Sequence, residues 1–141
     1  MLIKDRETGR RLIENGIGKE GEDGYVELTP LEVEYAIEEG LIEGENGDVS
    51  SSARYAVYKY LMDKGYIVRE CSDSSFLKVS SRGYRKGEER STTLIRVVEG
   101  NIKKEEIIED MRVAGRARKG LVYCFMEEKP VLVSLVRKSF P

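Results

Sequence analysis

Basic residues gather around positions 112–120, where a helix is expected to end and a strand to begin. Arg112, Arg116 and Lys119 are spaced at i, i+4 and i+7, which puts them roughly on one helix face. On such a face they could meet phosphates together. They could equally stabilise the helix C-terminus, because cations complement the helix dipole there. Four cations in the hydrophilic segment 81–90 form a second basic element, and the two elements together favour RNA or DNA as a ligand: Arg82, Arg85, Lys86 and Arg90.

The chain has 141 residues and no histidine. Histidine is the commonest general acid or base because its pKa lies nearest neutrality. Any acid–base chemistry of this chain must therefore use Tyr, Lys, Asp, Glu or a metal held by oxygen ligands.

One carboxylate-lysine sequence could belong to a metal-dependent nuclease. Glu127 and Lys129 match the E-x-K half of the restriction-type signature, which needs a second carboxylate on a neighbouring strand. Asp73 is the only tempting partner, but it lies 54 residues upstream, and Pro130 indicates that 127–130 is a turn. We therefore expect neither a metal site nor a cofactor.

The charges are distributed unevenly along the chain. Residues 1–50 carry 14 acidic and 5 basic side chains, a net charge of −9, whereas residues 51–141 carry 12 acidic and 19 basic ones, a net charge of +7. A turn-rich segment, 44–52, separates the two parts. We predict an acidic module over 1–48 and a second module over 52–141 that meets an anionic ligand.

The composition is that of a folded protein, with 40% hydrophobic and 35% charged residues. No apolar run approaches the roughly 20 residues that span a bilayer, and the N-terminus lacks a signal-peptide core. Cys71 and Cys124 lack C-x-x-C spacing, so we interpret them as reduced thiols of an intracellular, cytoplasmic protein.

Periodicity and capping signals predict an α+β protein. In the first module we expect strands near 2–4 and 25–28, a helical turn near 10–16, and a helix over 29–40 with Thr29, Pro30 and Glu32 at its start. In the second module the expected order is helix 52–65, strands 66–69, 75–80 and 92–99, helix 102–118, and a hairpin of strands 121–126 and 131–136.

Two apolar features have alternative interpretations. Tyr55, Tyr58, Tyr60 and Tyr66 could stack on bases, but their helical spacing favours core positions. The last strand, 131–136, is apolar on both faces apart from Ser134. That pattern is typical of an edge that pairs with another subunit, and burial inside the chain's own sheet would give the same pattern.

The order and spacing of these segments resemble the archaeal tRNA-splicing (tRNA-intron) endonuclease family. The resemblance covers essentially the full chain and is carried by LIKDRETGRRLIENG, TPLEVEYAIEEGLIEG, YAVYKYLMDKGYIVR and RVAGRARKGLVYCFMEEKPVLVSLV. It implies a small mixed α/β N-terminal module and a nuclease-like C-terminal module whose central mixed sheet is flanked by helices. It also implies excision of introns from precursor tRNA at bulge-helix-bulge sites, without metal, which leaves 2′,3′-cyclic phosphate and 5′-hydroxyl ends.

The resemblance also implies three catalytic positions, of which two have changed. In the family a tyrosine serves as general base where this chain has Ser80, and a histidine serves as general acid where this chain has Arg90. The transition-state lysine is retained as Lys119. Serine is a poor base and arginine stays protonated, so we expect no catalytic residue of this chain itself.

Some members of the family combine catalytic and structural subunits, usually two of each in a heterotetramer. The resemblance implies that this chain is a structural subunit that pairs through its last strand (Val131, Val133, Leu135). It implies that the acidic turn at Glu127 and Glu128 docks into a basic groove of a neighbour, and that Arg112 lies where members place an arginine against a bulged base. An autonomous ribonuclease using Tyr84 and Lys119, or a stand-alone RNA-binding module, are the alternatives.

Overall fold

The computed structural model describes residues 1–71, 75–80 and 93–138. Its internal contacts divide the chain into two units, Met1–Lys59 and Tyr60–Pro141, and each is described by itself. This division falls inside helix α3 (Ala53–Asp63). The module limits expected from the sequence, 1–48 and 52–141, remain a prediction.

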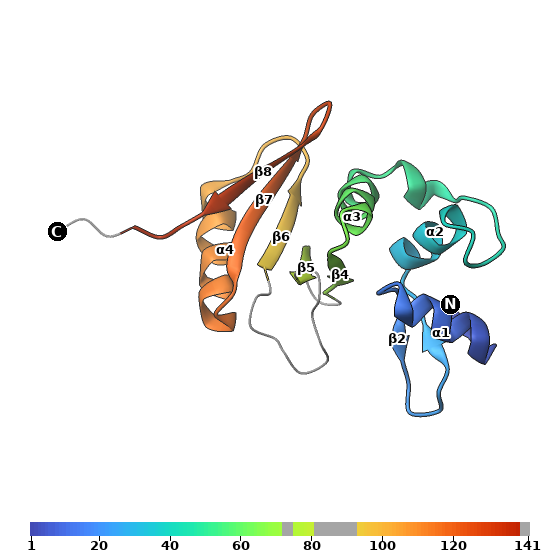
Figure 1. The fold of residues 1–141 in the computed structure, drawn as a ribbon. Helices are drawn as coiled ribbons and strands as arrows, with labels where there is room; N and C mark the ends of the chain where they lie inside the picture. The colour runs from blue at the N-terminus through green and yellow to red at the C-terminus, as the bar shows by residue number, and fades with distance from the viewer. Residues whose placement is uncertain (72–74, 81–92, 139–141) are drawn as a thin grey trace. The chain divides into compact units, whose positions relative to one another are not determined.

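The first unit combines a small sheet with short helices (Figure 1). The sheet is antiparallel in the order β1 (Leu2–Ile3), β3 (Val26–Glu27) and β2 (Lys19–Glu20). Helix α1 (Arg6–Glu14) starts where the Asp5 carboxylate accepts the Thr8 N–H at 3.1 Å. Helix α2 (Pro30–Glu38) and a short 3-10 turn, η1 (Asp48–Ser51), complete the unit up to the start of α3. Strand β2 was not expected from the sequence, because two exposed charged residues carry no periodic signal.

The starts of α2 and α3 predicted from the sequence are confirmed, whereas α1 begins at Arg6, before the helical turn expected near 10–16. The Thr29 hydroxyl accepts the Glu32 N–H at 3.4 Å, and the Glu32 carboxylate accepts the Thr29 N–H at 3.0 Å, which forms the capping box of α2. The Ser52 hydroxyl accepts the Tyr55 N–H at the start of α3. Glu32 is buried, and its carboxylate also accepts a hydrogen bond from the Gly18 N–H, so it satisfies backbone donors of two segments.

The tyrosines divide between core and surface. Tyr55 and Tyr58 are buried, and Tyr58 packs edge-on against Tyr35 with the ring centroids 5.7 Å apart. The core prediction is therefore confirmed for these two. Tyr60 is half-buried and Tyr66 is 40% exposed, because Tyr66 follows the glycine that ends α3.

The second unit is built on a mixed sheet in the order β4-β5-β6-β7-β8. Its strands are β4 (Ile67–Glu70), β5 (Phe76–Ser80), β6 (Thr93–Val98), β7 (Gly120–Met126) and β8 (Pro130–Leu135). Neighbouring strands are antiparallel except β6 and β7, which are parallel and joined through α4 (Lys104–Ala117). The predicted α+β class with a mixed sheet is confirmed.

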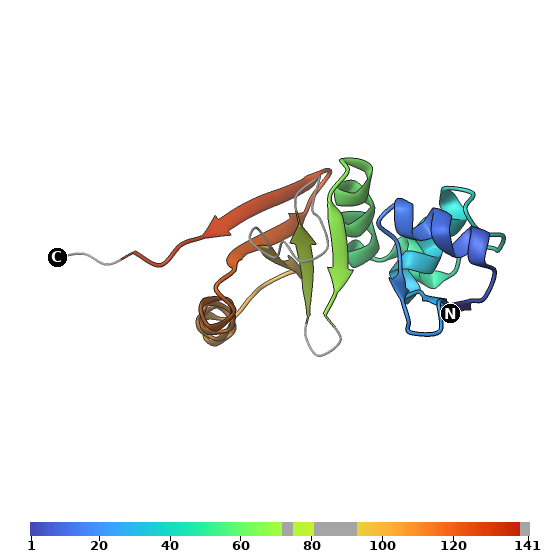
Figure 2. The same ribbon diagram turned by 60° about the horizontal axis from the view of Figure 1, so that its bottom comes forward.

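Helix α4 covers one face of this sheet over β6 and β7 (Figures 1 and 2). Its buried Ala114 packs with Leu94 of β6 and Leu121 of β7 in the core of the unit. Ile107 and Met111 are half-buried against the same core. Ala117, the last helical residue, is exposed.

Both cysteines, Cys71 and Cys124, are free. Among the helices of the described ranges, none combines the length and apolar character needed to cross a membrane.

Candidate nucleic-acid interface

One end of the mixed sheet brings together residues that are distant in sequence. Val79 of β5 lies opposite Thr93 of β6, and Thr93 lies opposite Gly120 of β7. Ser80, the next residue on β5, and Lys119, the residue before β7, therefore lie at the same end of the sheet. Two of the three positions singled out by the family resemblance are gathered there, and both side chains are half-buried.

The end of α4 determines where Lys119 lies. Arg118 adopts a left-handed conformation (φ 54°), and the Lys119 N–H donates to the Ala114 carbonyl at 3.0 Å. This cap turns the chain from the helix into β7. Lys119 thus follows the helix, and the spacing that suggested one shared helix face applies only to Arg112 and Arg116, which are both exposed.

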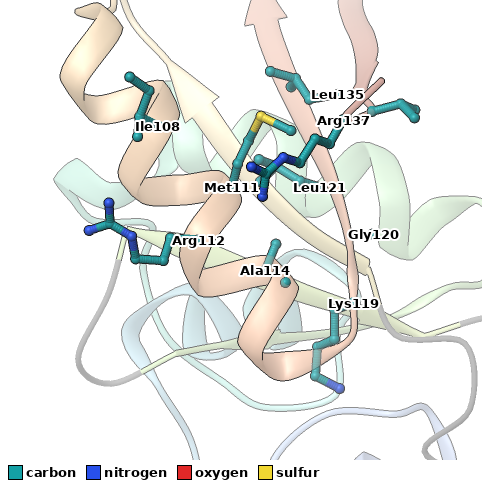
Figure 3. A pocket seen from close by; sticks show the side chains of 11 residues that line it. Ile108, Met111, Arg112, Ala114, Lys119, Gly120, Leu121, Leu135 and Arg137 are labelled. Atoms are coloured by element: carbon teal, nitrogen blue, oxygen red, sulfur yellow. The ribbon is translucent and has the colours of Figure 1, made fainter. Parts of the chain in front are cut away.

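A pocket of about 620 Å³ lies between α4 and the strands β7 and β8 (Figure 3). Its apolar part includes Ile108, Met111, Leu121 and Leu135, and its cations are Arg112, Lys119 and Arg137.

The three cations point in different directions. In Figure 3 the Arg137 side chain reaches over the pocket toward Met111, whereas those of Arg112 and Lys119 point away from the pocket. An apolar floor beside separate cations suits a ligand that has both a flat apolar face and negative charge, such as a nucleotide.

A polar network holds α4 on the sheet. Arg96 of β6 donates through Nη1 to both carboxylate oxygens of Asp110, each at 3.0 Å, and through Nη2 to Glu106 at 2.6 Å. The Tyr123 hydroxyl of β7 also donates to Asp110, which is only 5% exposed. Burial, and then the hydrogen bond to Asp110, raise the pKa of the Tyr123 phenol above its usual value. The network therefore fixes the helix whose end positions Lys119.

Strand β8 is an edge of the described sheet and is widely exposed. Val131 and Val133 are 44% and 43% exposed, and Leu132, which points to the opposite face, is 43% exposed. Leu135 is half-buried against the core. The alternative of a last strand buried inside its own sheet is thereby excluded for this chain as described.

The acidic turn precedes this strand. Glu127 and Glu128 are exposed between β7 and β8, and the Glu127 N–H donates to the Lys129 carbonyl at 3.4 Å. Pro130 lies one residue beyond the turn, as the first residue of β8, where an edge strand tolerates a missing N–H.

Six candidate residues lie outside the described part of the chain: Asp73, Arg82, Tyr84, Arg85, Lys86 and Arg90.

Two residues of this region, Arg137 and Asp110, were not expected from the sequence. Arg137 follows the last strand and gave no signal, because its place beside α4 depends on the pairing of β8 with β7. Asp110 was not singled out either, although a carboxylate three residues from apolar Ile107 and four from Ala114 could have indicated an inward-facing position.

Comparisons with known proteins identify a family and several similar proteins. A sequence model of the family described as tRNA intron endonuclease, catalytic C-terminal domain, matches residues 52–132. A tRNA-splicing endonuclease of Pyrococcus horikoshii is 33% identical over 111 residues, which cover 76% of this chain and 62% of that protein. One from Thermococcus kodakarensis is 34% identical over 127 residues, 75% of this chain and 73% of that protein. The chain thus spans less than two thirds of the Pyrococcus relative's length.

Proposed function

The chain belongs to the tRNA intron endonuclease family, and we propose that it is a structural, non-catalytic subunit of a tRNA-splicing endonuclease. In this proposal it binds precursor tRNA and assembles with a catalytic subunit, two copies of each, in a heterotetramer. The catalytic subunit cleaves at bulge-helix-bulge sites and leaves 2′,3′-cyclic phosphate and 5′-hydroxyl ends. The archaeal relatives, each named as a tRNA-splicing endonuclease, support the substrate assignment.

The observation that carries the proposal is that Ser80 and Lys119 lie at the same end of the sheet, on segments separated by β6. Attack by a ribose 2′-hydroxyl needs a base to remove its proton and an acid to protonate the leaving oxygen. A serine hydroxyl has too high a pKa to act as the base, and Lys119 supplies only positive charge. Because the chain contains no histidine, the side chain that most often donates protons near neutral pH is absent from the sequence.

The open edge of β8 supports assembly with a partner. Its N–H and C=O groups on the outer side pair with no strand among the described residues, and apolar side chains flank them on both faces. A strand from another subunit would satisfy the backbone groups and cover Val131, Leu132 and Val133 together. The exposed carboxylates of Glu127 and Glu128 lie next to this edge and suit a cationic groove on a neighbour.

The experiment compares the purified chain with the chain co-expressed with a catalytic subunit, on a bulge-helix-bulge RNA. We expect no cleavage by the chain alone and cleavage by the complex. Ser80→Ala in the complex should leave kcat unchanged, because the hydroxyl takes no part in proton transfer. Cleavage by the isolated chain would refute the proposal, and loss of that cleavage in Tyr84→Phe would identify the autonomous ribonuclease instead.

A further inference from the structure

We propose that the RNA backbone crosses the end of the mixed sheet from β5 to β8, on the α4 side, and does not run along α4. Three cations hold it there, and we call them the edge strip: Lys78, Lys119 and Arg137. This inference rests on the proposed function, in which the chain binds precursor tRNA. It adds the route of the RNA and assigns two further RNA contacts, Lys78 and Arg137.

The strand register places the edge strip on one face. Directly opposite residues form a row across four strands: Lys78, Leu94, Leu121 and Leu135. Leu94 and Leu121 pack with Ala114, so this row faces α4. Side chains alternate along a strand, so residues two positions further toward the sheet end keep the same face. Those residues are Ser80, Lys119 and Arg137, and the presence of Lys119 and Arg137 in the pocket beside α4 agrees with this assignment.

The spacing of the strip suits an extended polyanion. Neighbouring strands lie about 4.8 Å apart, so β5 and β8 are separated by about 14 Å. Lys78 stands at one end of this span, Arg137 at the other, and Lys119 between them. Cations spread over this distance contact successive phosphates along a strand of RNA, whereas a single bound phosphate needs cations that converge.

The charges along the strip also favour an anion. Lys78, Lys119 and Arg137 form no ion pair with any residue of 1–71, 75–80 or 93–138. On α4, in contrast, Arg112 already donates to Glu109 at 2.9 Å. Like charges aligned at one sheet end repel one another, and a bound phosphate backbone removes that repulsion. The strip therefore offers three cations that no carboxylate of the described residues neutralises, whereas Arg112 on α4 is already paired.

The first experiment places a carboxylate inside the strip and needs no RNA. Ser80→Asp puts a negative charge between Lys78 and Lys119, and Ser80→Asn is its uncharged control of the same shape. We expect Ser80→Asp to have a higher Tm than Ser80→Asn at low salt, with the difference lost at high salt. Equal Tm values at low salt would overturn the placement of the two lysines around Ser80.

The second experiment measures the binding of single-stranded oligouridine to the full chain as a function of salt. Lys78→Gln and Arg137→Gln should each reduce the slope of log Kd against log salt by about 0.7, the share of one phosphate contact. Arg116→Gln, which removes an exposed cation of α4, should leave the slope unchanged. A smaller slope in Arg116→Gln with normal slopes in the two strip variants would place the RNA on the helix. An unmodified chain that fails to bind oligouridine would also overturn the inference.

These measurements separate the route of the RNA from the role of the chain. If the co-expressed complex fails to cut bulge-helix-bulge RNA while the strip variants lose their slope, the strip is right and the proposed function is wrong. If the complex cuts and the strip variants bind oligouridine normally, the proposed function holds and the strip is wrong.

Discussion

Replacement of Asp110 by asparagine tests whether the buried network holds α4 on the sheet. Asp110→Asn keeps the shape of the side chain and removes its charge. The carboxylate accepts two hydrogen bonds from Arg96 and one from Tyr123, and asparagine can accept no more than part of this set because its amide nitrogen is a donor. The variant also leaves the Arg96 guanidinium, whose side chain is 21% exposed, with Glu106 as its remaining partner among the described network residues.

The expected loss follows from these contacts. Hydrogen bonds to charged groups contribute about 1.5–3 kcal/mol each, and removing one partner of a buried pair costs about 3–5 kcal/mol. Because Arg96 is partly exposed and keeps Glu106, we expect a loss of about 2.5 kcal/mol in the free energy of unfolding. At about 4 °C for each kcal/mol in a chain of this size, Tm falls by about 10 °C.

Thermal and urea denaturation, followed by circular dichroism, measure this loss. Glu106→Gln is the matched control, since the Glu106 side chain is 39% exposed and a surface ion pair contributes at most about 1 kcal/mol. Tyr123→Phe should couple with Asp110→Asn in a double-mutant cycle by more than about 0.5 kcal/mol. An Asp110→Asn variant as stable as Glu106→Gln, with no coupling to Tyr123, would refute the reasoning.

Three further predictions concern the edge strand, the acidic turn and the behaviour at high pH. Val133→Lys should weaken assembly with the catalytic partner at least about tenfold in sedimentation, because the interface must then bury a charge, whereas Ile13→Lys, a comparable exposed site in the first unit, should not. Glu127→Lys combined with Glu128→Lys should weaken assembly or RNA cleavage, and an unchanged tetramer and turnover would disprove docking by this turn. The raised pKa of Tyr123 means that the folded chain holds the phenol proton more tightly than the unfolded chain does. The contribution of this group to the free energy of unfolding is therefore complete below pH about 10 and is lost as the pH rises further. Urea unfolding of Tyr123→Phe should show less of this loss at high pH.

Local signals in the sequence were sufficient for most elements of the fold. The Thr29–Glu32 capping box, the Ser52 cap and the aliphatic and β-branched residues of β5 and β6 act over a few residues, and each element formed where expected. Strand β2 was missed because pairing with β3, and not its own composition, makes it a strand.

The site was less predictable because it depends on contacts between distant segments. Lys78 and Arg137 share a face with Lys119 only through the register of four strands, and no spacing along the chain encodes that register. Asp110 is buried because Arg96, 14 residues earlier, reaches it from β6. Lys119 itself was identified by family resemblance. The helical spacing that grouped it with Arg112 and Arg116 does not apply to it, because Arg118 ends α4 in a left-handed conformation usually reserved for glycine.

The open edge of β8, with its exposed valines and leucine, makes the chain prone to aggregation when no partner subunit is bound. Another copy of the chain can pair its own edge strand with β8, and repeated pairing of this kind starts the growth of fibrils. Lys129 before β8 and Arg137 after it slow that process by mutual repulsion between copies, as charged gatekeepers do, but they leave the middle of the strand unprotected. We therefore expect a cell to tolerate little surplus of this polypeptide and to synthesise it in step with whatever covers β8.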